Sequence, residues 1–370
     1  MKIGIVTFQR ADNQGALLQC YALHSYLKKL EANTEVIDYR TNHIERIYKI
    51  FPLSKNPKFL IKRWMRGIRC YSTLKKRQEN FRRLREKICL SPSYTNSQLK
   101  QKPLDYDLIF TGSDQVWNTN ITCGFDDIFY LNFPGSYVKA SYAASLGSTD
   151  NPAFQKDYFR EKLSAFDGLS VREKDAAAFI SETVSKPAVQ CVDPTLLLER
   201  SEWEMLTKEA EISLPERYVL LYFVQKSPEL LKIAEKIAKE RNIPVVCLDQ
   251  NVQLDCETIY HTTAGPIEFV KMIQNAETVV TSSFHATAFS CIFERDIHII
   301  AHSVTGSRVV SLTEMFGVAD RIYASLEDFE NRYRPEERLT YDRTQYLAQY
   351  AQSVKYIDDM IQLAGGASHE

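Results

Sequence analysis

The feature of this chain that most constrains its fold is the alternation of short apolar runs with longer segments of helical periodicity. In the first half we expect a helix at 16–30 and strands at 2–8, 34–39, 106–110, 139–145 and 168–172. In the second half the pattern predicts strands at 218–224, 244–249, 277–281 and 297–301, separated by helices at 228–241, 266–275 and 286–293. Such alternation is typical of parallel sheets covered by helices, so the predicted class is α/β.

Two domains are expected from the length and from a pause in this pattern. A chain of 370 residues exceeds what one hydrophobic core usually serves, and the alternation pauses near Asp193-Pro194-Thr195. We predict Rossmann-like parallel α/β domains at 1–200 and 201–335, and an amphipathic C-terminal helix within 336–370. The two domains would face a cleft lined by strand ends, which is a preferred position for small-molecule sites.

The composition excludes several classes of protein. The net charge of −1 gives no overall attraction to nucleic acid, and no apolar run approaches the ~20 residues that a membrane span requires. The N-terminal apolar run is too short for a signal peptide. The eight scattered cysteines lack a C-x-x-C pair, which favours reduced core thiols over a zinc site. We therefore expect a cytoplasmic protein.

A polar segment after the expected strand at 277–281 is the strongest candidate for a functional site. Ser282, Ser283 and His285 stand where this strand gives way to a helix, and ligands bind at the carboxyl ends of strands in open α/β sheets. Free N–H groups at a helix start favour an anion, and the imidazole can carry a proton near neutral pH. Alternatively, Ser282 or Ser283 caps the helix and His285 is structural.

The loop after the first strand is a second candidate. Gly15 permits close approach of a ligand to the backbone, and Asn13 lies just before a helix start. The alternative is that Asp12 or Asn13 only caps that helix. The loop lacks the G-x-G-x-x-G pattern of dinucleotide-binding proteins.

A third candidate is the turn that we expect at Thr111-Gly112-Ser113-Asp114. Asp114, with Gln115 and Asn118 after it, supplies polar groups suited to holding hydroxyls at a strand end. In the alternative interpretation the segment is a tight turn in which Ser113 or Asp114 caps a helix.

Two arginines can bind a carboxylate or phosphate in a bidentate manner. Arg172 ends the expected strand at 168–172, and Arg308 follows Gly306-Ser307. Each can equally belong to a surface ion pair, which for Arg172 would involve Glu173.

The segment 57–90 differs from the rest of the chain. Apolar residues recur in it at helical spacing, and twelve lysines and arginines between residues 58 and 87 outnumber Glu79 and Glu86. Such an insertion can bind an acidic membrane surface or a lipid-linked phosphate, or it can be a solvated helix face packed on the first domain. Its aromatic residues fall on the apolar face, which argues against nucleic acid.

Taken together, these motifs resemble the polysaccharide pyruvyl transferase family along nearly the whole chain. The segments that carry the resemblance follow one another in order: Asn13-Gln14-Gly15-Ala16-Leu17-Leu18-Gln19, Gly112-Ser113-Asp114-Gln115-Val116-Trp117-Asn118, Ser141-Tyr142-Ala143-Ala144-Ser145, Ser170-Val171-Arg172-Glu173-Lys174, Asp193-Pro194-Thr195-Leu196-Leu197 and Ser282-Ser283-Phe284-His285. The resemblance implies a two-domain fold similar to that of GT-B glycosyltransferases, with an N-terminal acceptor side and a C-terminal donor side. It implies no metal or organic cofactor.

The resemblance also implies a reaction. The pyruvyl group of phosphoenolpyruvate would pass to a sugar of a cell-surface polysaccharide or its lipid-linked precursor, forming a cyclic ketal and releasing phosphate. His285 matches the family's histidine, and Arg172 matches an arginine implicated in donor binding. We take His285 and Asp114 as catalytic candidates. The substrate-binding candidates are Asn13, Gly15, Ser113, Gln115, Asn118, Arg172, Ser282, Ser283 and Arg308.

The expected partners are therefore phosphoenolpyruvate and a lipid-linked sugar acceptor, with no nucleic acid. Through its basic segment the protein would contact the anionic inner face of the plasma membrane as a peripheral protein.

The chain departs from the family pattern at two positions. Ser283 stands where many members have an arginine, with Arg308 as a candidate replacement, and Gln14 stands where tyrosine is common. Two alternative functions follow. One is a GT-B-type glycosyltransferase that uses a nucleotide sugar, for which Glu294 is the nearest candidate to hold a donor ribose. The other is a non-catalytic glycan-binding protein.

Overall fold

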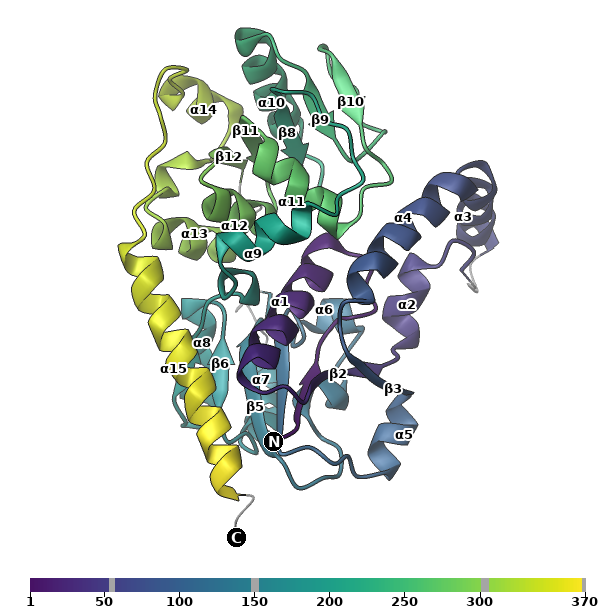
Figure 1. Cartoon of the computed structure of the whole chain (residues 1–370), viewed down its shortest axis with the longest axis vertical. Coiled ribbons are helices and arrows are strands. Elements are labelled where there is room, and N and C mark those ends of the chain that lie inside the picture. The colour runs from purple at the N-terminus through teal and green to yellow at the C-terminus, as the bar shows by residue number, and fades with distance from the viewer. Residues whose placement is uncertain (53–56, 148–152, 301–305, 368–370) are drawn as a thin grey trace. The chain divides into compact units, whose positions relative to one another are not determined.

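The computed structural model describes residues 1–52, 57–147, 153–300 and 306–367, which form two compact units (Figure 1). Unit 1 comprises Met1–Tyr71, Arg82–Leu197 and Ala348–Glu370, and unit 2 comprises Ser72–Phe81 and Leu198–Leu347. Most of the C-terminal helix therefore groups with the N-terminal sheet, and part of the basic segment groups with unit 2.

Among the described residues, seven parallel strands form the sheet of unit 1, in the order β3-β2-β1-β4-β5-β6-β7. The strands are β1 (Ile3–Val6), β2 (Thr34–Tyr39), β3 (Leu90–Tyr94), β4 (Leu108–Asp114), β5 (Val138–Ala144), β6 (Leu169–Val171) and β7 (Ala188–Gln190). Since β1 lies between β2 and β4, the chain winds first to one side of β1 and then to the other. The carboxyl ends of β1 and β4 border this topological switch point, where ligands bind in open α/β sheets.

Helices and short 3-10 segments (η) connect these strands. They are α1 (Gln14–Leu30), α2 (Asn42–Tyr48), α3 (Pro57–Arg69), α4 (Tyr71–Arg85), α5 (Asn96–Gln101), α6 (Thr119–Thr122), η1 (Asp127–Tyr130), α7 (Ala153–Leu163), α8 (Lys174–Val184) and η2 (Pro194–Leu196), and α15 (Thr344–Ala367) ends the chain. Strand β1 is buried along its whole length, as expected for a parallel sheet covered on both faces.

Unit 2 repeats the design with a smaller sheet, six strands among the described residues, in the order β10-β9-β8-β11-β12-β13. The strands are β8 (Val219–Tyr222), β9 (Val245–Cys247), β10 (Thr258–Tyr260), β11 (Thr278–Thr281), β12 (Asp296–Ile300) and β13 (Ile322–Tyr323). The remaining elements are α9 (Arg200–Thr207), α10 (Pro228–Arg241), α11 (Pro266–Asn275), α12 (Phe284–Phe293), α13 (Gly306–Met315), η3 (Ala319–Arg321) and α14 (Leu326–Arg332). Here the switch point lies between β8 and β11, the strand that precedes the predicted histidine motif.

The predicted helices at 228–241 and 266–275 match α10 and α11 at both ends, for an identifiable reason. Each begins with a proline at its first position, and α10 is capped by the Ser227 side chain and is followed by Asn242 in the left-handed region. Proline at the start and a left-handed residue after the end are the strongest local helix signals.

The predicted turn at 111–114 is wrong, because β4 continues through it. Gly112 pairs with Tyr142 and Asp114 with Ala144 of β5. The two backbones approach so closely that a Cβ on Gly112 would lie 2.5 Å from the Tyr142 carbonyl oxygen, and its φ is +106°. A glycine lets the strand pass where a side chain would have ended it.

The basic segment 57–90 forms two helices, α3 and α4, followed by the edge strand β3. Phe81, Leu84 and Ile88 are buried, as the packed interpretation predicts, but Ile68 and Tyr71 are exposed. The expected burial of the apolar positions therefore holds for the end of the segment, whereas α3 leaves Ile68 exposed. No helix among the described residues is long and apolar enough to cross a membrane.

Candidate functional site

At the switch point of unit 1, hydrogen bonds fix the loop between β1 and α1. Asn13 is the N-cap of α1, and its Oδ1 accepts a hydrogen bond from the Ala16 N–H (3.1 Å). Gly15 is buried in the first turn. Asp12 accepts a hydrogen bond from Nη2 of Arg85 (2.8 Å) at the end of the basic segment. The capping role of Asn13 is confirmed, and ligand contact by Asn13 and Gly15 stays a prediction.

Strand β4 ends beside this loop in a set of polar side chains. Asp114 Oδ1 accepts from the Gln115 N–H (2.8 Å), and Asn118 Nδ2 donates to Gln115 Oε1 (2.7 Å). Ser113 is fully buried and donates to the Ala143 carbonyl (2.7 Å). Asp114, Gln115 and Asn118 are thus half-buried groups at the sheet edge, whereas the Ser113 hydroxyl joins β4 to β5.

Gly147 shapes this edge, because any side chain there would displace two of these amides. Its φ is +78°, and a Cβ would lie 2.2 Å from Asn118 Nδ2 and 2.4 Å from Gln115 Oε1. The amide pair therefore packs directly on bare backbone, which fixes the orientation of its polar groups.

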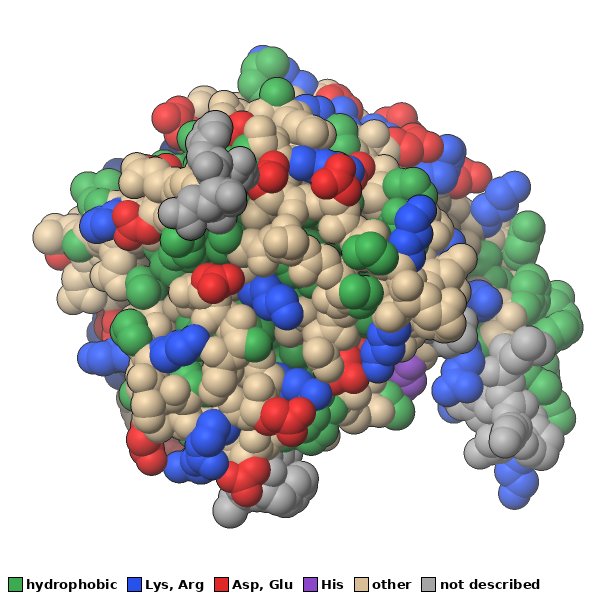
Figure 2. Space-filling view, turned by 90° about the horizontal axis from the view of Figure 1, so that it is seen from below, with side chains coloured by type: hydrophobic (Ala, Val, Ile, Leu, Met, Phe, Trp, Pro, Cys, Tyr) green, Lys and Arg blue, Asp and Glu red, His purple; other side chains and the backbone are tan. Residues whose placement is uncertain are grey.

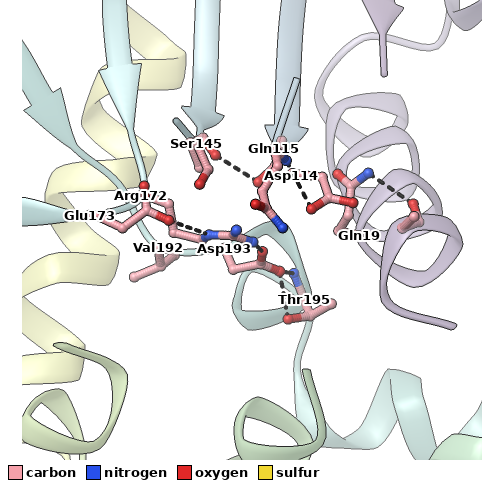
Figure 3. A network of polar contacts seen from close by, with 12 residues as sticks. Gln19, Asp114, Gln115, Ser145, Arg172, Glu173, Val192, Asp193 and Thr195 are labelled. Carbon is pink, nitrogen blue, oxygen red and sulfur yellow. Dashed lines mark hydrogen bonds and ion pairs between the residues drawn. The ribbon is translucent and has the colours of Figure 1, made fainter. Parts of the chain in front are cut away.

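Arg172 is buried near the same edge between two carboxylates (Figure 3). Its Nη1 donates to Asp193 Oδ2 (2.7 Å) and its Nε to Glu173 Oε1 (3.2 Å). Asp193 Oδ1 accepts in turn from the N–H and the hydroxyl of Thr195, at 3.0 and 2.8 Å. The interpretation of Arg172 and Glu173 as a surface pair is wrong, since both are only 4% exposed.

The charges around Arg172 do not balance within this cluster. Burial by itself lowers the pKa of the guanidinium, but the carboxylates of Glu173, Asp193 and Asp114 hold the pKa above its ordinary value. One cation is thus surrounded by three carboxylates. Arg172 stabilises these carboxylates strongly, and little of its positive charge is left to attract an anionic ligand.

A buried chain of hydrogen bonds ties the switch point together. Gln19 Nε2 of α1 donates to Thr7 Oγ1 (2.9 Å), and the Thr7 hydroxyl donates to the Ser113 carbonyl (3.2 Å). The first strand, the first helix and β4 are therefore held in one arrangement, with Gln19 on the α1 side of Asp114 (Figure 3).

In unit 2, the histidine motif lies at the corresponding position, where β11 ends at the switch point. Ser283 is the N-cap of α12: its Oγ accepts from the Ala286 N–H (3.4 Å), and its own N–H donates to Thr281 Oγ1 (3.0 Å). The helix begins at Phe284 rather than 286, so His285 lies in its first turn and is half-buried. Of the two predicted capping serines, Ser283 is the cap, and ligand contact by it stays a prediction.

Ser282 and His285 remain the groups of this motif that can meet a ligand. Ser282 Oγ is a buried atom that has no hydrogen-bond partner among the described residues. The His285 ring lies edge-on to Phe284, with their centroids 5.2 Å apart. The segment from Ser282 to the first turn of α12 thus places a hydroxyl, an imidazole and helix N–H groups after the end of β11.

Arg308 and Glu294 occupy different ends of the neighbouring helices. Arg308 lies in the first turn of α13, which packs against α12, and is 8% exposed. Glu294 is the C-cap of α12 and pairs with Arg343 (3.0 Å). Since α12 has ten residues, Glu294 lies about 15 Å along the helix from its start, away from the strand ends.

Unit 1 also contains a cavity that the sequence did not indicate, at the carboxyl ends of β2 and β3. Its volume is about 330 Å³, and its walls include Tyr39, Arg40, His43, Asn96, Asp126 and Phe129. Asp126 accepts hydrogen bonds from the Tyr39 hydroxyl (2.7 Å) and from Asn96 Nδ2 (3.4 Å). Burial raises the pKa values of Asp126 and of Tyr39. A carboxylate, an amide and hydroxyls beside an aromatic ring suit a small polyhydroxylated ligand.

Sequence reasoning missed the residues that hold the site together. The sequence indicates Asp193 only as part of a motif, although its carboxylate fixes Arg172. Gln19, also in a quoted motif, is buried and pairs with Thr7. A polar residue within an otherwise apolar helix face was the available signal in the case of Gln19. No pattern of spacing indicated the cavity, because it joins segments far apart in the chain.

The described ranges contain no evident metal-binding site. No group of three or more His, Cys, Asp or Glu residues there is arranged to hold a metal ion. The eight cysteines are free, and four of them, Cys20, Cys191, Cys247 and Cys291, are buried.

Comparison with known proteins gives one family and several distant folds. A family model described as polysaccharide pyruvyl transferase matches residues 13–303. No curated protein matches the chain. The UDP-GlcNAc 2-epimerase of Methanocaldococcus jannaschii, solved with UDP-GlcNAc and UDP, is 13% identical with a TM-score of 0.55, over 96% of this chain and 99% of that one.

Two further solved structures are similar over almost their whole length. The UDP-N-acetylglucosamine 2-epimerase of Rickettsia bellii has a TM-score of 0.49 at 10% identity, covering 98% of this chain and 96% of its own. Arabidopsis thaliana UGT89C1, complexed with quercetin, has a TM-score of 0.48 at 10% identity, covering 99% and 98%. The prediction of two parallel α/β domains similar to the GT-B fold is confirmed.

Proposed function

Because the chain belongs to the polysaccharide pyruvyl transferase family, we propose that it transfers the pyruvyl group of phosphoenolpyruvate to two hydroxyls of a sugar. The enzyme is a transferase, and its acceptor belongs to a polysaccharide. The observation that carries the proposal is His285 in the first turn of α12, directly after β11 at a topological switch point.

In the proposed reaction, the C3 carbon of phosphoenolpyruvate gains a proton and C2 takes the first sugar hydroxyl. The second hydroxyl then closes the ketal at C2 as the phosphate leaves with the bridging oxygen. His285 donates the proton to C3 and afterwards accepts one from a sugar hydroxyl, while the proton of the other hydroxyl leaves with the phosphate. Asp114, half-buried at the end of β4, accepts a hydrogen bond from an acceptor hydroxyl.

The charges favour unit 2 as the donor side. Phosphoenolpyruvate carries a carboxylate and a phosphate, which suit helix N–H groups and arginine. The hydroxyl of Ser282 lies just before the N-cap of α12, and Arg308 lies in the first turn of α13. Arg172 serves in this proposal as a positioning residue for the β4 edge, since Asp193 and Glu173 already hold its guanidinium.

The cavity at the ends of β2 and β3 is the proposed position of an acceptor sugar. Asn96→Ala or Asp126→Asn removes one hydrogen bond to a sugar hydroxyl, which should raise the KM for the acceptor about three- to tenfold. The KM for phosphoenolpyruvate should not change. Lys100→Gln is a matched control, because Lys100 lies on the same helix as Asn96 and pairs with Asp127 outside the cavity. An unchanged acceptor KM in both variants removes the cavity from the proposal.

The acceptor is proposed to be lipid-linked. Lys62, Arg66 and Arg69 are exposed on α3, and their glutamine variant should raise the KM for a lipid-linked acceptor but not for a short soluble one. Arg63 is left out of this variant because it donates to the carbonyls of Ile47 and Lys49 (3.0 and 3.1 Å). An unchanged KM for the lipid-linked acceptor in the variant contradicts the proposed role of these residues in binding a lipid-linked substrate.

The deciding experiment is phosphate release from phosphoenolpyruvate with a panel of lipid-linked sugars. We expect release with at least one acceptor, and calorimetric binding of phosphoenolpyruvate in preference to uridine or guanosine sugars. The position of Glu294 at the far end of α12 supports this preference, because no other carboxylate was a candidate for a donor ribose. Tight binding of a nucleotide sugar without binding of phosphoenolpyruvate would instead identify a glycosyltransferase, and neither binding would indicate a glycan-binding protein.

A further inference from the structure

Helix α3 exposes a ridge of large apolar side chains. Ile61, Met65 and Ile68 are 60%, 66% and 71% exposed, and Trp64 beside them is 42% exposed. Their spacing of three and four residues puts them on one face of the helix. Seven of the fourteen exposed large hydrophobic side chains among the described residues lie between Ile47 and Tyr71, so this ridge belongs to a contiguous patch and is not a scatter of single residues.

The side of α3 next to the ridge packs on the preceding segment 47–52, so the ridge cannot simply turn inward. Gly67 packs so closely that a Cβ would lie 2.8 Å from the Phe51 ring. Trp64 packs on the same ring, 5.2 Å between centroids, and its Nε1 donates to the Pro52 carbonyl (3.2 Å). Arg63 holds the carbonyls of the preceding segment from the same side. α3 therefore presents its apolar ridge outward in a defined orientation.

A basic strip runs beside the ridge. Lys58, Lys62, Arg66 and Arg69 are exposed, and α3 contains no acidic residue. Figure 2 shows hydrophobic and basic side chains gathered together at the right of the view. On a helix, these four positions lie about a quarter-turn from the apolar ridge, which is the arrangement of helices that lie in a membrane surface.

We propose that α3 lies in the plane of an anionic bilayer surface, with Ile61, Met65 and Ile68 among the acyl chains and the basic strip at the lipid phosphates. With thirteen residues, the helix is about 20 Å long, too short to span a bilayer. A second copy of the chain is a poorer partner for this face, because two copies would bring eight cations together. The proposal needs neither donor nor acceptor sugar and is independent of the reaction.

Trp64 makes this surface directly observable. The other two tryptophans, Trp117 and Trp203, are 1% and 0% exposed and lie out of reach of lipid. We expect vesicles of phosphatidylcholine with anionic phosphatidylglycerol to shift the emission of the full-length protein to the blue, and lipids brominated on their acyl chains to quench it. Trp64→Phe should abolish both changes, which assigns the signal.

Two triple variants separate insertion from electrostatic attraction. Ile61→Ser, Met65→Ser and Ile68→Ser together should lower partition into anionic vesicles about tenfold or more and abolish quenching by brominated lipid. Lys62→Gln, Arg66→Gln and Arg69→Gln together should lower partition mainly into anionic vesicles and at low salt. The matched control is Met205→Ser, Val224→Ser and Leu347→Ser, which removes exposed apolar side chains elsewhere and should leave partition unchanged. Unchanged thermal unfolding confirms that each variant folds.

Four outcomes overturn the proposal. The wild type fails to float with anionic vesicles, or it floats without quenching of Trp64, which indicates surface attraction only. In the third outcome, sedimentation shows a dimer that the serine variant dissociates, which makes a second copy the partner of α3. Binding of single-stranded nucleic acid in place of vesicles would equally exclude a membrane.

Discussion

The two switch points of this protein have the same topology but opposite chemistry. In unit 1, Arg172 is buried and forms ion pairs with Asp193 and Glu173, so its positive charge stabilises carboxylates inside the protein. In unit 2, His285 in the first turn of α12 and Ser282 just before that helix are half-buried polar groups. The first site is a fixed electrostatic framework, whereas the second has groups that can exchange a proton with a substrate.

This difference shows that a residue within a family motif need not be a residue that contacts the substrate. Arg172 and His285 both lie in segments that resemble the family, yet their surroundings favour a structural role for Arg172 and a catalytic role for His285. Loss of a fixed framework should lower stability, and loss of a proton-transfer group should lower turnover with little effect on stability. Each of the following predictions tests that division.

The largest effect is expected from His285→Ala. Removal of a general acid and base should lower turnover about 10²–10⁴-fold, measured as phosphate release from phosphoenolpyruvate with a responsive acceptor. The imidazole is half-buried and lies edge-on to the Phe284 ring, so the free energy of unfolding from urea denaturation should fall by no more than about 1 kcal/mol.

His261→Ala is the matched control for this variant. His261 is another half-buried histidine of unit 2, and it also follows a strand end, that of β10. β10 lies at the edge of the sheet and not at its switch point, so turnover should be unchanged. Equal loss of activity in both variants would mean that position at the switch point does not select the functional histidine.

Arg172→Leu should be the most destabilising change. Removing the cation leaves the buried carboxylates of Asp193 and Glu173 uncompensated, at a cost of about 3–5 kcal/mol in the free energy of unfolding, measured by urea denaturation. The added change Asp193→Asn should restore part of this stability, because it removes one of the two charges. A stable Arg172→Leu protein that has lost only phosphoenolpyruvate binding would instead make Arg172 a donor-binding residue.

The sequence predicted the architecture well because the signals for parallel α/β folds are local. The apolar runs for β1, β2 and β5 and the proline-started helices α10 and α11 were found within about two residues. Edge strands were harder: β3 contains Pro92, which normally argues against a strand but is tolerated at the edge of a sheet. The prediction of a turn at 111–114 is wrong because a glycine in the local sequence favours a turn. The conformation of Gly112 is instead determined by the close approach of the neighbouring β5 backbone.

The candidate site was predicted only as far as motifs reach. His285 and the β4 edge were named from their positions after strands, and the structure gives both a place beside a switch point. The engagement of Arg172 by Asp193, 21 positions away, depends on packing that no local pattern carries. The exposure of Ile68 likewise cannot be predicted from the sequence, since the same helical spacing describes a buried face and an exposed one.

Gly147→Ala should have an intermediate effect on the unit 1 site. A methyl group there collides with Asn118 Nδ2 and Gln115 Oε1, and the φ of +78° is unfavourable for alanine. We expect a loss of about 1–3 kcal/mol in stability and a raised acceptor KM, with the KM for phosphoenolpyruvate unchanged. If the donor KM rises instead, the β4 edge binds the donor, and the assignment of donor and acceptor sides is reversed.

The smallest effect concerns His24, a histidine of unit 1 with a purely structural environment. Burial, with a smaller contribution from Lys28, lowers its pKa to about 4, and its Nε2 accepts a hydrogen bond from the Cys89 N–H (3.2 Å). A histidine with a lowered pKa in the folded state binds its proton first in the unfolded state. Its contribution to stability is therefore complete above pH 6.5 and is lost as the pH falls toward 4.

The His24→Gln variant should expose this contribution as a difference in slope. Glutamine keeps an acceptor for the Cys89 N–H but does not titrate, so the variant should lose about 2 kcal/mol less than the wild type between pH 7 and pH 5. Urea denaturation at intervals of half a pH unit measures both curves, and other buried histidines, such as His298, contribute equally to each. Turnover at pH 7 should be unaffected. Parallel stability curves would show that His24 is solvated in the folded state, and a drop in turnover would extend the functional region of unit 1 to the far side of α1.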